Sequence, residues 1–164
     1  ITTLLMMPAL SITADEPAVP APPKTLYVVP FLYVMIPDAV SLFLFDDFID
    51  RMMSAGRQHD VEIRILKQDI DSIDKIWLSQ QHFITGELFG YLEESGCCST
   101  ELEVKARIYC FAPGSIEAVR EIVVQEETFF DHDLSTLAEE RQLLAGDVAR
   151  QLSEQLLEEL IPTQ

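Results

Sequence analysis

The sequence is short of positive charge. It has 11 lysine and arginine residues against 28 aspartate and glutamate residues, which gives a formal net charge of −17 at pH 7. Binding to nucleic-acid phosphates or to an anionic membrane surface needs a positive field, so this balance argues against both. A chain of this charge can attract a basic partner, although the charge also serves simply to keep a domain soluble.

The sequence also lacks the short motifs that mark common enzyme classes. No serine stands in a GxSxG-like elbow, no glycine-rich loop is suited to cradle phosphates, and no stretch has the spacing and glycine of a calcium loop. The segment from Gly86 to Gly90 is typical of a strand. We therefore predict a protein that is not an enzyme and holds no cofactor, although acid–base pairs can also assemble from distant positions.

Cysteine and histidine are scarce, with three of each. Cys97, Cys98 and Cys110 have no metal-binding spacing. Cys97 and Cys98 are neighbours in a predicted turn, where they are either ordinary small residues or a vicinal disulfide. The compartment decides which, so the sequence leaves the redox state of all three open.

The strongest metal candidate is His132, because Asp131 and Asp133 flank it and imidazole and carboxylate groups are common ligands. Neighbouring residues rarely all face one ion, however, and a solvated helix start, at which acids are favoured, explains the same residues. We expect no metal there. The acidic residues within 46–50 are expected to form a solvated helical face.

Long hydrophobic runs are absent too. Residues 1–14, ITTLLMMPALSITA, are apolar but shorter than the roughly 20 residues that a membrane span needs. They look like the apolar region and cleavage site of a secretory signal, with no lipid-anchor cysteine after it. Alternatively they form an apolar arm that docks on a neighbouring subunit. Residues 15–24 contain four prolines and are predicted to be an extended linker.

Residues 25–161 are predicted to form a single α+β domain. A buried strand is expected at 25–34, with Pro30 at its end or at a bulge, and a helix at 41–55 that Gly56 ends. Then follow a half-buried strand at 60–67 and a short helix at 69–78. Three further strands are predicted at 82–94, 101–111 and 115–130, and a helix from Asp133 or Ser135 to Leu160.

Turn residues between the last three strands indicate an antiparallel meander. We therefore expect a mixed sheet, covered by the early helix and the long carboxy-terminal helix. The last helix is amphipathic and longer than one sheet requires, so its apolar stripe is a candidate partner surface. The candidate residues are Leu152, Leu156 and Leu160.

Two short motifs add a family resemblance. Val28-Val29-Pro30-Phe31 precedes a helix, and Phe83-Ile84-Thr85-Gly86-Glu87-Leu88 begins the meander. This pattern resembles the small periplasmic domain shared by the curli-secretion lipoprotein, the penicillin-binding-protein activator lipoproteins and the amino-terminal domain of the Tol translocation β-propeller protein. The resemblance covers about residues 25–160 and implies a fold, not a catalytic site. The chain lacks the lipoproteins' anchoring cysteine and is too short for the hairpins of a secretion pore.

These observations favour a periplasmic or extracellular protein that serves as an assembly or accessory binding module of a larger secretion or envelope complex. Its expected partner is another protein or a second copy of itself. One alternative is a subunit of an extracellular polymer that uses residues 1–14 as its arm. A second alternative is a metal-dependent hydrolase built around His132.

Overall fold

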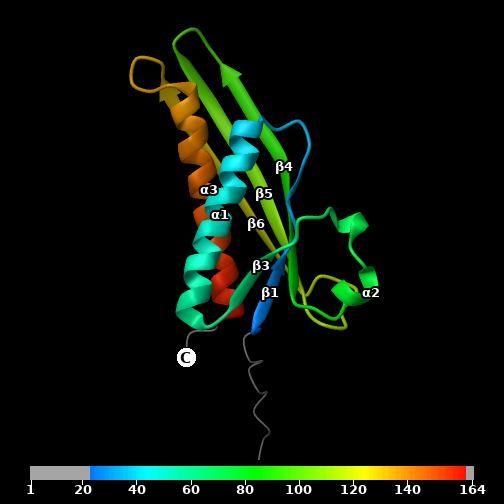
Figure 1. Ribbon diagram of the computed structural model, residues 1–164. Helices are drawn as coiled ribbons and strands as arrows, with labels where there is room; N and C mark the ends of the chain where they lie inside the picture. The colour runs from blue at the N-terminus through cyan, green and yellow to red at the C-terminus, as the bar shows by residue number, and fades with distance from the viewer. Residues whose placement is uncertain (1–22, 162–164) are drawn as a thin grey trace, which may run out of the picture.

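The computed structural model describes residues 23–161, which fold into one sheet with two long helices (Figure 1). The predicted linker at 15–24 and the apolar segment at 1–14 therefore lie almost wholly outside the described residues. In chain order the elements are β1 (Thr25–Val28), β2 (Leu32–Tyr33), α1 (Asp38–His59), β3 (Glu62–Ile65), the 3₁₀ turn η1 (Ile70–Ser72), α2 (Lys75–Leu78), β4 (Phe83–Ser95), β5 (Ser99–Phe111), β6 (Arg120–Asp131) and α3 (Leu137–Leu160).

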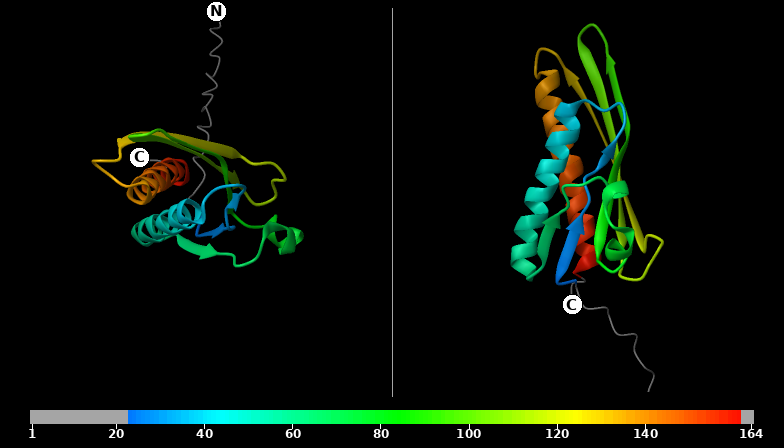
Figure 2. Two further views of the ribbon diagram at one scale, coloured as in Figure 1. Left: turned by 90° about the horizontal axis from the view of Figure 1, so that it is seen from above. Right: turned by 45° about the vertical axis from the view of Figure 1, so that its right-hand side comes forward.

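The sheet is mixed, as the sequence predicts. Its strand order is β3-β1-β4-β5-β6, and β2 pairs with β4 outside this path. The strands β3, β1 and β4 run parallel, β2 runs parallel to β4, and β4, β5 and β6 form the predicted antiparallel meander. Figure 2 shows α1 and α3 side by side on one face of the meander, while no helix of the described residues covers its opposite face.

The alternation of β5 determines which face of the meander is buried. Its inward side chains are all buried, as predicted, and comprise Leu102, Val104, Ala106, Ile108 and Cys110. They pack against the buried stripes of α1 and α3 in the main core. Burial of this apolar surface, at about 25 cal/mol per Å², is the main force holding the two helices on the sheet.

The predicted strand at 25–34 is divided in two. Pro30 separates β1 from β2, because a residue without an amide hydrogen cannot continue the ladder. Between the two strands the Phe31 side chain turns into the core, 5.2 Å from the rings of Phe45 and Phe48. Gly86 lies directly beneath it, and the absence of a side chain there lets the Phe31 ring approach the β4 backbone closely.

The prediction that α1 ends at Gly56 is wrong. The helix continues to His59 and ends at Asp60, which adopts the left-handed conformation with φ 57°. Gly56 is needed for a different reason, since a Cβ at this position would lie 2.5 Å from the carbonyl oxygen of Val61. At the other end α1 begins at Asp38, after Pro37.

Two other predicted boundaries change for local reasons. The helix α3 does not begin at Asp133 or Ser135, because Thr136 forms a capping box with Glu139 and the helix begins one residue later. The helix predicted at 69–78 is interrupted at Ile73, which is extended, and only α2 is α-helical. Ile73 instead enters a small second core with Val29, Leu78 and Phe83.

Candidate interaction surfaces

The residues around His132 form a hydrogen-bonded loop and not a ligand set. The imidazole Nε2 of His132 lies 2.8 Å from the Thr100 hydroxyl, and its backbone N–H donates to the Cys98 carbonyl at 2.9 Å. Asp131 accepts a hydrogen bond from the backbone of Asp133 at 2.9 Å. Across residues 23–161, no three histidine, cysteine, aspartate or glutamate side chains converge as metal ligands would.

The three leucines proposed to contact a partner serve the core of the domain instead. Leu152 and Leu156 are fully buried against the sheet, and Leu160 is half-buried at the edge of the same core. Their stripe is the face by which α3 covers β5 and β6. Side chains already packed inside the chain are not available to another protein, so a partner surface has to be sought elsewhere.

The cluster formed by Tyr91, Glu93 and Arg141 ties β4 to α3. Arg141 donates to the Glu93 carboxylate and to the Tyr91 hydroxyl, and Tyr91 donates to Glu93. The hydrogen bond from Tyr91 is the main cause that lowers the pKa of Glu93, while burial raises the pKa of Tyr91 to about 12. With no group ready to exchange a proton near pH 7, this cluster supports structure rather than acid–base catalysis.

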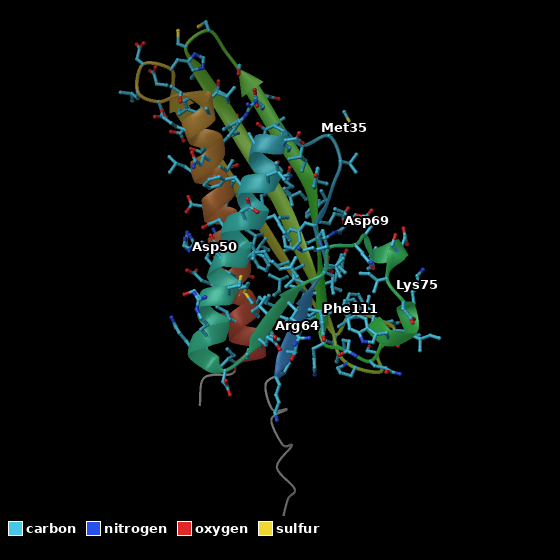
Figure 3. All side chains as sticks on the ribbon, in the orientation of Figure 1. Met35, Asp50, Arg64, Asp69, Lys75 and Phe111 are labelled. Atoms are coloured by element: carbon cyan, nitrogen blue, oxygen red, sulfur yellow. The ribbon has the colours of Figure 1, made fainter. Side chains whose placement is uncertain are left out.

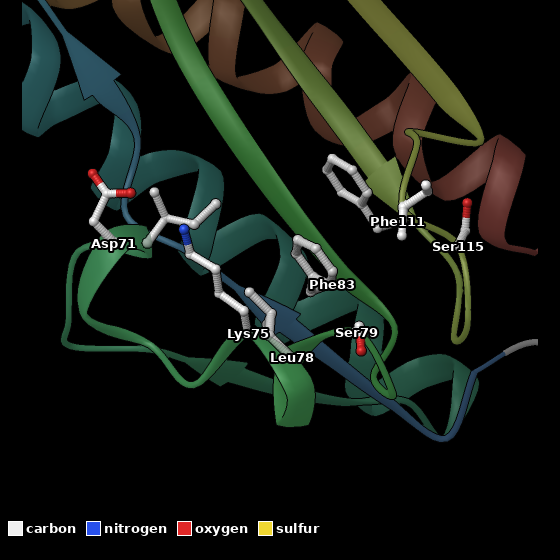
Figure 4. A pocket seen from close by; sticks show the side chains of 9 residues that line it. Asp71, Lys75, Leu78, Ser79, Phe83, Phe111 and Ser115 are labelled. Carbon is white, nitrogen blue, oxygen red and sulfur yellow. The ribbon is translucent and has the colours of Figure 1, made fainter.

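The cavity beside the second core has a volume of about 350 Å³. Figure 4 shows the stacked rings of Phe83 and Phe111 among its lining residues, together with Lys75 and Asp71. The ring centroids are 4.4 Å apart. The cavity walls are mainly apolar, and the hydroxyls of Ser79 and Ser115 that line it donate to backbone carbonyls, so the cavity is suited to hold an apolar group.

The uncovered face of the meander carries charges that neutralise one another. Arg107 binds Glu87 at 2.7 Å and lies 3.7 Å from Glu121, and its guanidinium stacks on the rings of Phe89 and Tyr109. A guanidinium so engaged leaves little of its charge for an incoming anion. Phe89, the residue at the bulge between Leu88 and Gly90, lies on this face under the Arg107 guanidinium.

Within residues 23–161, the most exposed apolar segment is the run from Leu32 to Met35. These four consecutive residues have exposed fractions of 57, 45, 79 and 95 per cent. Figure 3 shows Met35 at the outer bend of the connection from β2 to α1, with its side chain directed away from the domain. Met35 has φ 58°, a left-handed conformation that costs a non-glycine residue on the order of 1 kcal/mol or more. We call residues 32–35 the apolar run.

The sequence prediction missed the apolar run, because apolar and aromatic residues at 25–34 indicated a strand buried throughout. Pro30 was the only signal of a break. β2 pairs with β4 through Glu87 and Leu88, and in the described part of the chain it has no strand on its other side. An open strand edge thus lies beside exposed apolar side chains, as is typical of surfaces that bind another chain.

Comparisons with known proteins identify the fold but no family. Neither the protein-family models nor the curated proteins include a match to this chain. Among the helices of residues 23–161, none has both the length and the apolar character needed to cross a bilayer.

Several solved bacterial structures share the fold. The PelC dodecamer from Paraburkholderia phytofirmans has a TM-score of 0.55 and 14% sequence identity over 87% of this chain and 94% of PelC. A hypothetical protein from Chlamydia trachomatis has a TM-score of 0.57 and 8% identity over 85% of this chain and 98% of that one. A protein from Xanthomonas campestris has a TM-score of 0.54 and 10% identity over 92% of this chain and 90% of that one.

Other similar structures are bacterial lipoproteins by name, at TM-scores below 0.5, which is too low to support an inference. The general part of the sequence resemblance, a small domain with one mixed sheet and covering helices, agrees with the bacterial structures of TM-score above 0.5, which show the fold alone. They do not single out the curli-secretion, penicillin-binding-protein-activator or Tol proteins, so that finer part remains a prediction.

Proposed function

We propose that this chain is a non-catalytic protein of the bacterial envelope that associates with copies of itself and serves as an assembly or accessory module of a larger secretion or envelope complex. The observation that supports it best is the apolar run beside the open edge of β2. Consecutive exposed apolar residues weaken a domain's solubility and are retained where they have a function.

The distribution of charge favours a second copy of this chain as the molecule that binds to the apolar run. Residues 25–37 contain no charged side chain, whereas the chain as a whole carries −17. Two such chains repel each other over most of their surfaces and can approach most easily where charge is missing. A basic partner would instead be drawn to the acidic surfaces. The dodecameric state of PelC, which shares the fold, also supports self-association.

An envelope location is proposed from residues 1–14, whose apolar pattern resembles a secretory signal. The polymer alternative depends on the same segment acting as an arm, and it remains a prediction because those residues lie outside the described part. The hydrolase alternative gains no support from His132, whose imidazole is already bonded to Thr100.

The experiment is sedimentation velocity of the full chain and of the variant Val34→Glu over a range of concentrations. Val34 is exposed, so the substitution leaves the monomer core intact. If the apolar run is an interface, each copy of the variant has to bury an unpaired carboxylate there. Every 1.4 kcal/mol of lost binding free energy weakens association tenfold, so self-association should weaken about tenfold or more. Far-ultraviolet circular dichroism checks that the variant is folded.

Ile116→Glu is the matched control. Ile116 is 93% exposed in the connection between β5 and β6, so this change adds the same charge elsewhere on the molecule. It should leave self-association unchanged. A wild-type chain that stays monomeric at every concentration would overturn the proposal, and so would equal effects of the two substitutions, since these would indicate general charge repulsion.

A further inference from the structure

Two cysteines form the whole loop of the hairpin between β4 and β5. The Gly96 N–H donates to the Ser99 carbonyl at 2.8 Å, and Cys97 and Cys98 are the two residues enclosed. Both are exposed, and their sulfur atoms lie 3.2 Å apart as free thiols. This hairpin tip is at the top of Figure 1, at the other end of the meander from α2.

The shape of the turn does not explain the cysteines. Two-residue hairpin loops favour asparagine, aspartate or glycine, because the preferred turns need positive φ. Neither Cys97 nor Cys98 has positive φ, so the loop adopts a less favoured turn with residues that turns do not select. Exposed thiols are also a chemical liability in a domain without a use for them.

Cys110 cannot be the disulfide partner of either cysteine within one chain. It lies at the opposite end of β5, 12 residues from Cys98, which at about 3.3 Å per residue is about 40 Å along the strand. Its side chain is buried on the helix-covered face, and burial raises the pKa of its thiol to about 11, so the reactive thiolate is rare. Within one chain, Cys97 and Cys98 can therefore form a disulfide only with each other.

We infer that Cys97 and Cys98 are a reversible redox-modification site, a dithiol that closes to a disulfide between adjacent residues by exchange with a small-molecule disulfide. The thiolate of one cysteine attacks a sulfur of the small molecule, which forms a mixed disulfide and releases one small-molecule thiol. The second cysteine then displaces the other half. Two electrons and two protons pass from the cysteines to the small molecule, which leaves as two thiols.

The adjacency of the residues predicts that the bond is labile. Consecutive Cα atoms are about 3.8 Å apart, whereas ordinary disulfides join Cα atoms about 4.4–6.8 Å apart. A disulfide closed at the shorter distance is strained, and strained exposed disulfides are the easily reduced ones. The pair should thus open and close with the surrounding thiol balance instead of acting as a permanent staple.

The pair is also connected to the loop between β6 and α3. The Cys98 carbonyl accepts the backbone N–H of His132 at 2.9 Å, and the His132 ring contacts the Thr100 hydroxyl at 2.8 Å. Thr100 in turn contacts Ser95 across the hairpin at 2.9 Å. Ring closure changes the backbone torsions of Cys98 and hence the direction of its carbonyl, so it should loosen the hydrogen bond from His132 and speed hydrogen exchange at the His132 amide.

The test is maleimide labelling of the full native chain after equilibration in glutathione buffers, followed by intact mass and peptide mapping. In reduced glutathione, Cys97 and Cys98 should each take one label. In glutathione disulfide both should become unreactive, with a mass about 2 Da lower and no bound glutathione. About a tenfold excess of reduced glutathione should restore both labels.

Matched variants make the outcome decisive. Cys110→Ser should behave as the wild type, whereas Cys98→Ser should retain one glutathione on Cys97, because nothing is left to displace it. The inference is overturned if both cysteines stay reactive in glutathione disulfide, if stable glutathione adducts form on the wild type, or if the oxidised product is a disulfide-linked dimer. Each outcome is independent of the self-association test on Val34→Glu.

Discussion

The contact between Gly86 and Phe31 allows a quantitative prediction. A Cβ added at Gly86 would lie 2.3, 2.4 and 2.6 Å from three atoms of the Phe31 ring. The ring is 6% exposed and is held by Phe45 and Phe48 of α1, so it has little room to move. Gly86→Ala should therefore force Phe31 and the chain around it out of place.

The magnitude follows from two opposing effects. Overpacking of a well-filled core costs about 1–3 kcal/mol. Alanine recovers about 0.5–1 kcal/mol in a strand, because glycine loses more conformational freedom on folding. The net loss of unfolding free energy should be up to about 2.5 kcal/mol, which corresponds to a fall in Tm of up to about 10 °C for a chain of this size.

The assay is urea unfolding followed by circular dichroism, with Gly90→Ala as the control. A Cβ at Gly90 would meet only the flexible Lys105 side chain, at 3.0 Å, so this variant should lose no stability and should gain up to about 1 kcal/mol from the same conformational effect. Since Phe31 immediately precedes the apolar run, Gly86→Ala should also weaken self-association, and Gly90→Ala should not. If the two variants are equally stable, Phe31 is not locked against Gly86 and the reasoning fails.

Two pH-dependent predictions follow from the remaining polar groups. The hydrogen bond from Tyr91 lowers the pKa of Glu93, so the stabilisation from Glu93 is complete above its unfolded pKa and is lost as pH falls through the folded value. Glu93→Gln should cost about 1 kcal/mol of unfolding free energy at pH 7, and urea titrations should show that difference shrinking below about pH 4; a difference independent of pH would contradict this. Burial lowers the pKa of His82, so its contribution is complete above about pH 6.5 and is lost as pH falls below it. His82→Gln should reduce the loss of unfolding free energy as pH falls from about 7 to 5. An unchanged pH profile would show that His82 does not cause this loss.

Local patterns in the sequence are enough to predict most elements of this fold. Strict alternation in β5 identifies its buried face, and helical spacing identifies the stripe of α3. Such patterns reflect backbone geometry, with a period of two in strands and 3.6 in helices, so they can be read without knowledge of distant residues. The errors at Gly56 and at the start of α3 are local as well, because competing caps one turn away decided the boundaries.

The candidate surfaces depended on contacts between residues far apart in the chain. A periodic pattern marks Leu152 and Leu156 as apolar but cannot say whether the sheet or a partner covers them, and here the sheet does. Leu32 to Val34 belonged to the predicted buried strand, yet after Pro30 only Phe31 packs into the core, and the next four side chains are exposed. Likewise only the folded hairpin brings Cys98 to His132. Composition and spacing thus determine which residues are apolar, charged or reactive, whereas burial and proximity are properties of the whole packed chain, because they depend on what lies opposite each residue.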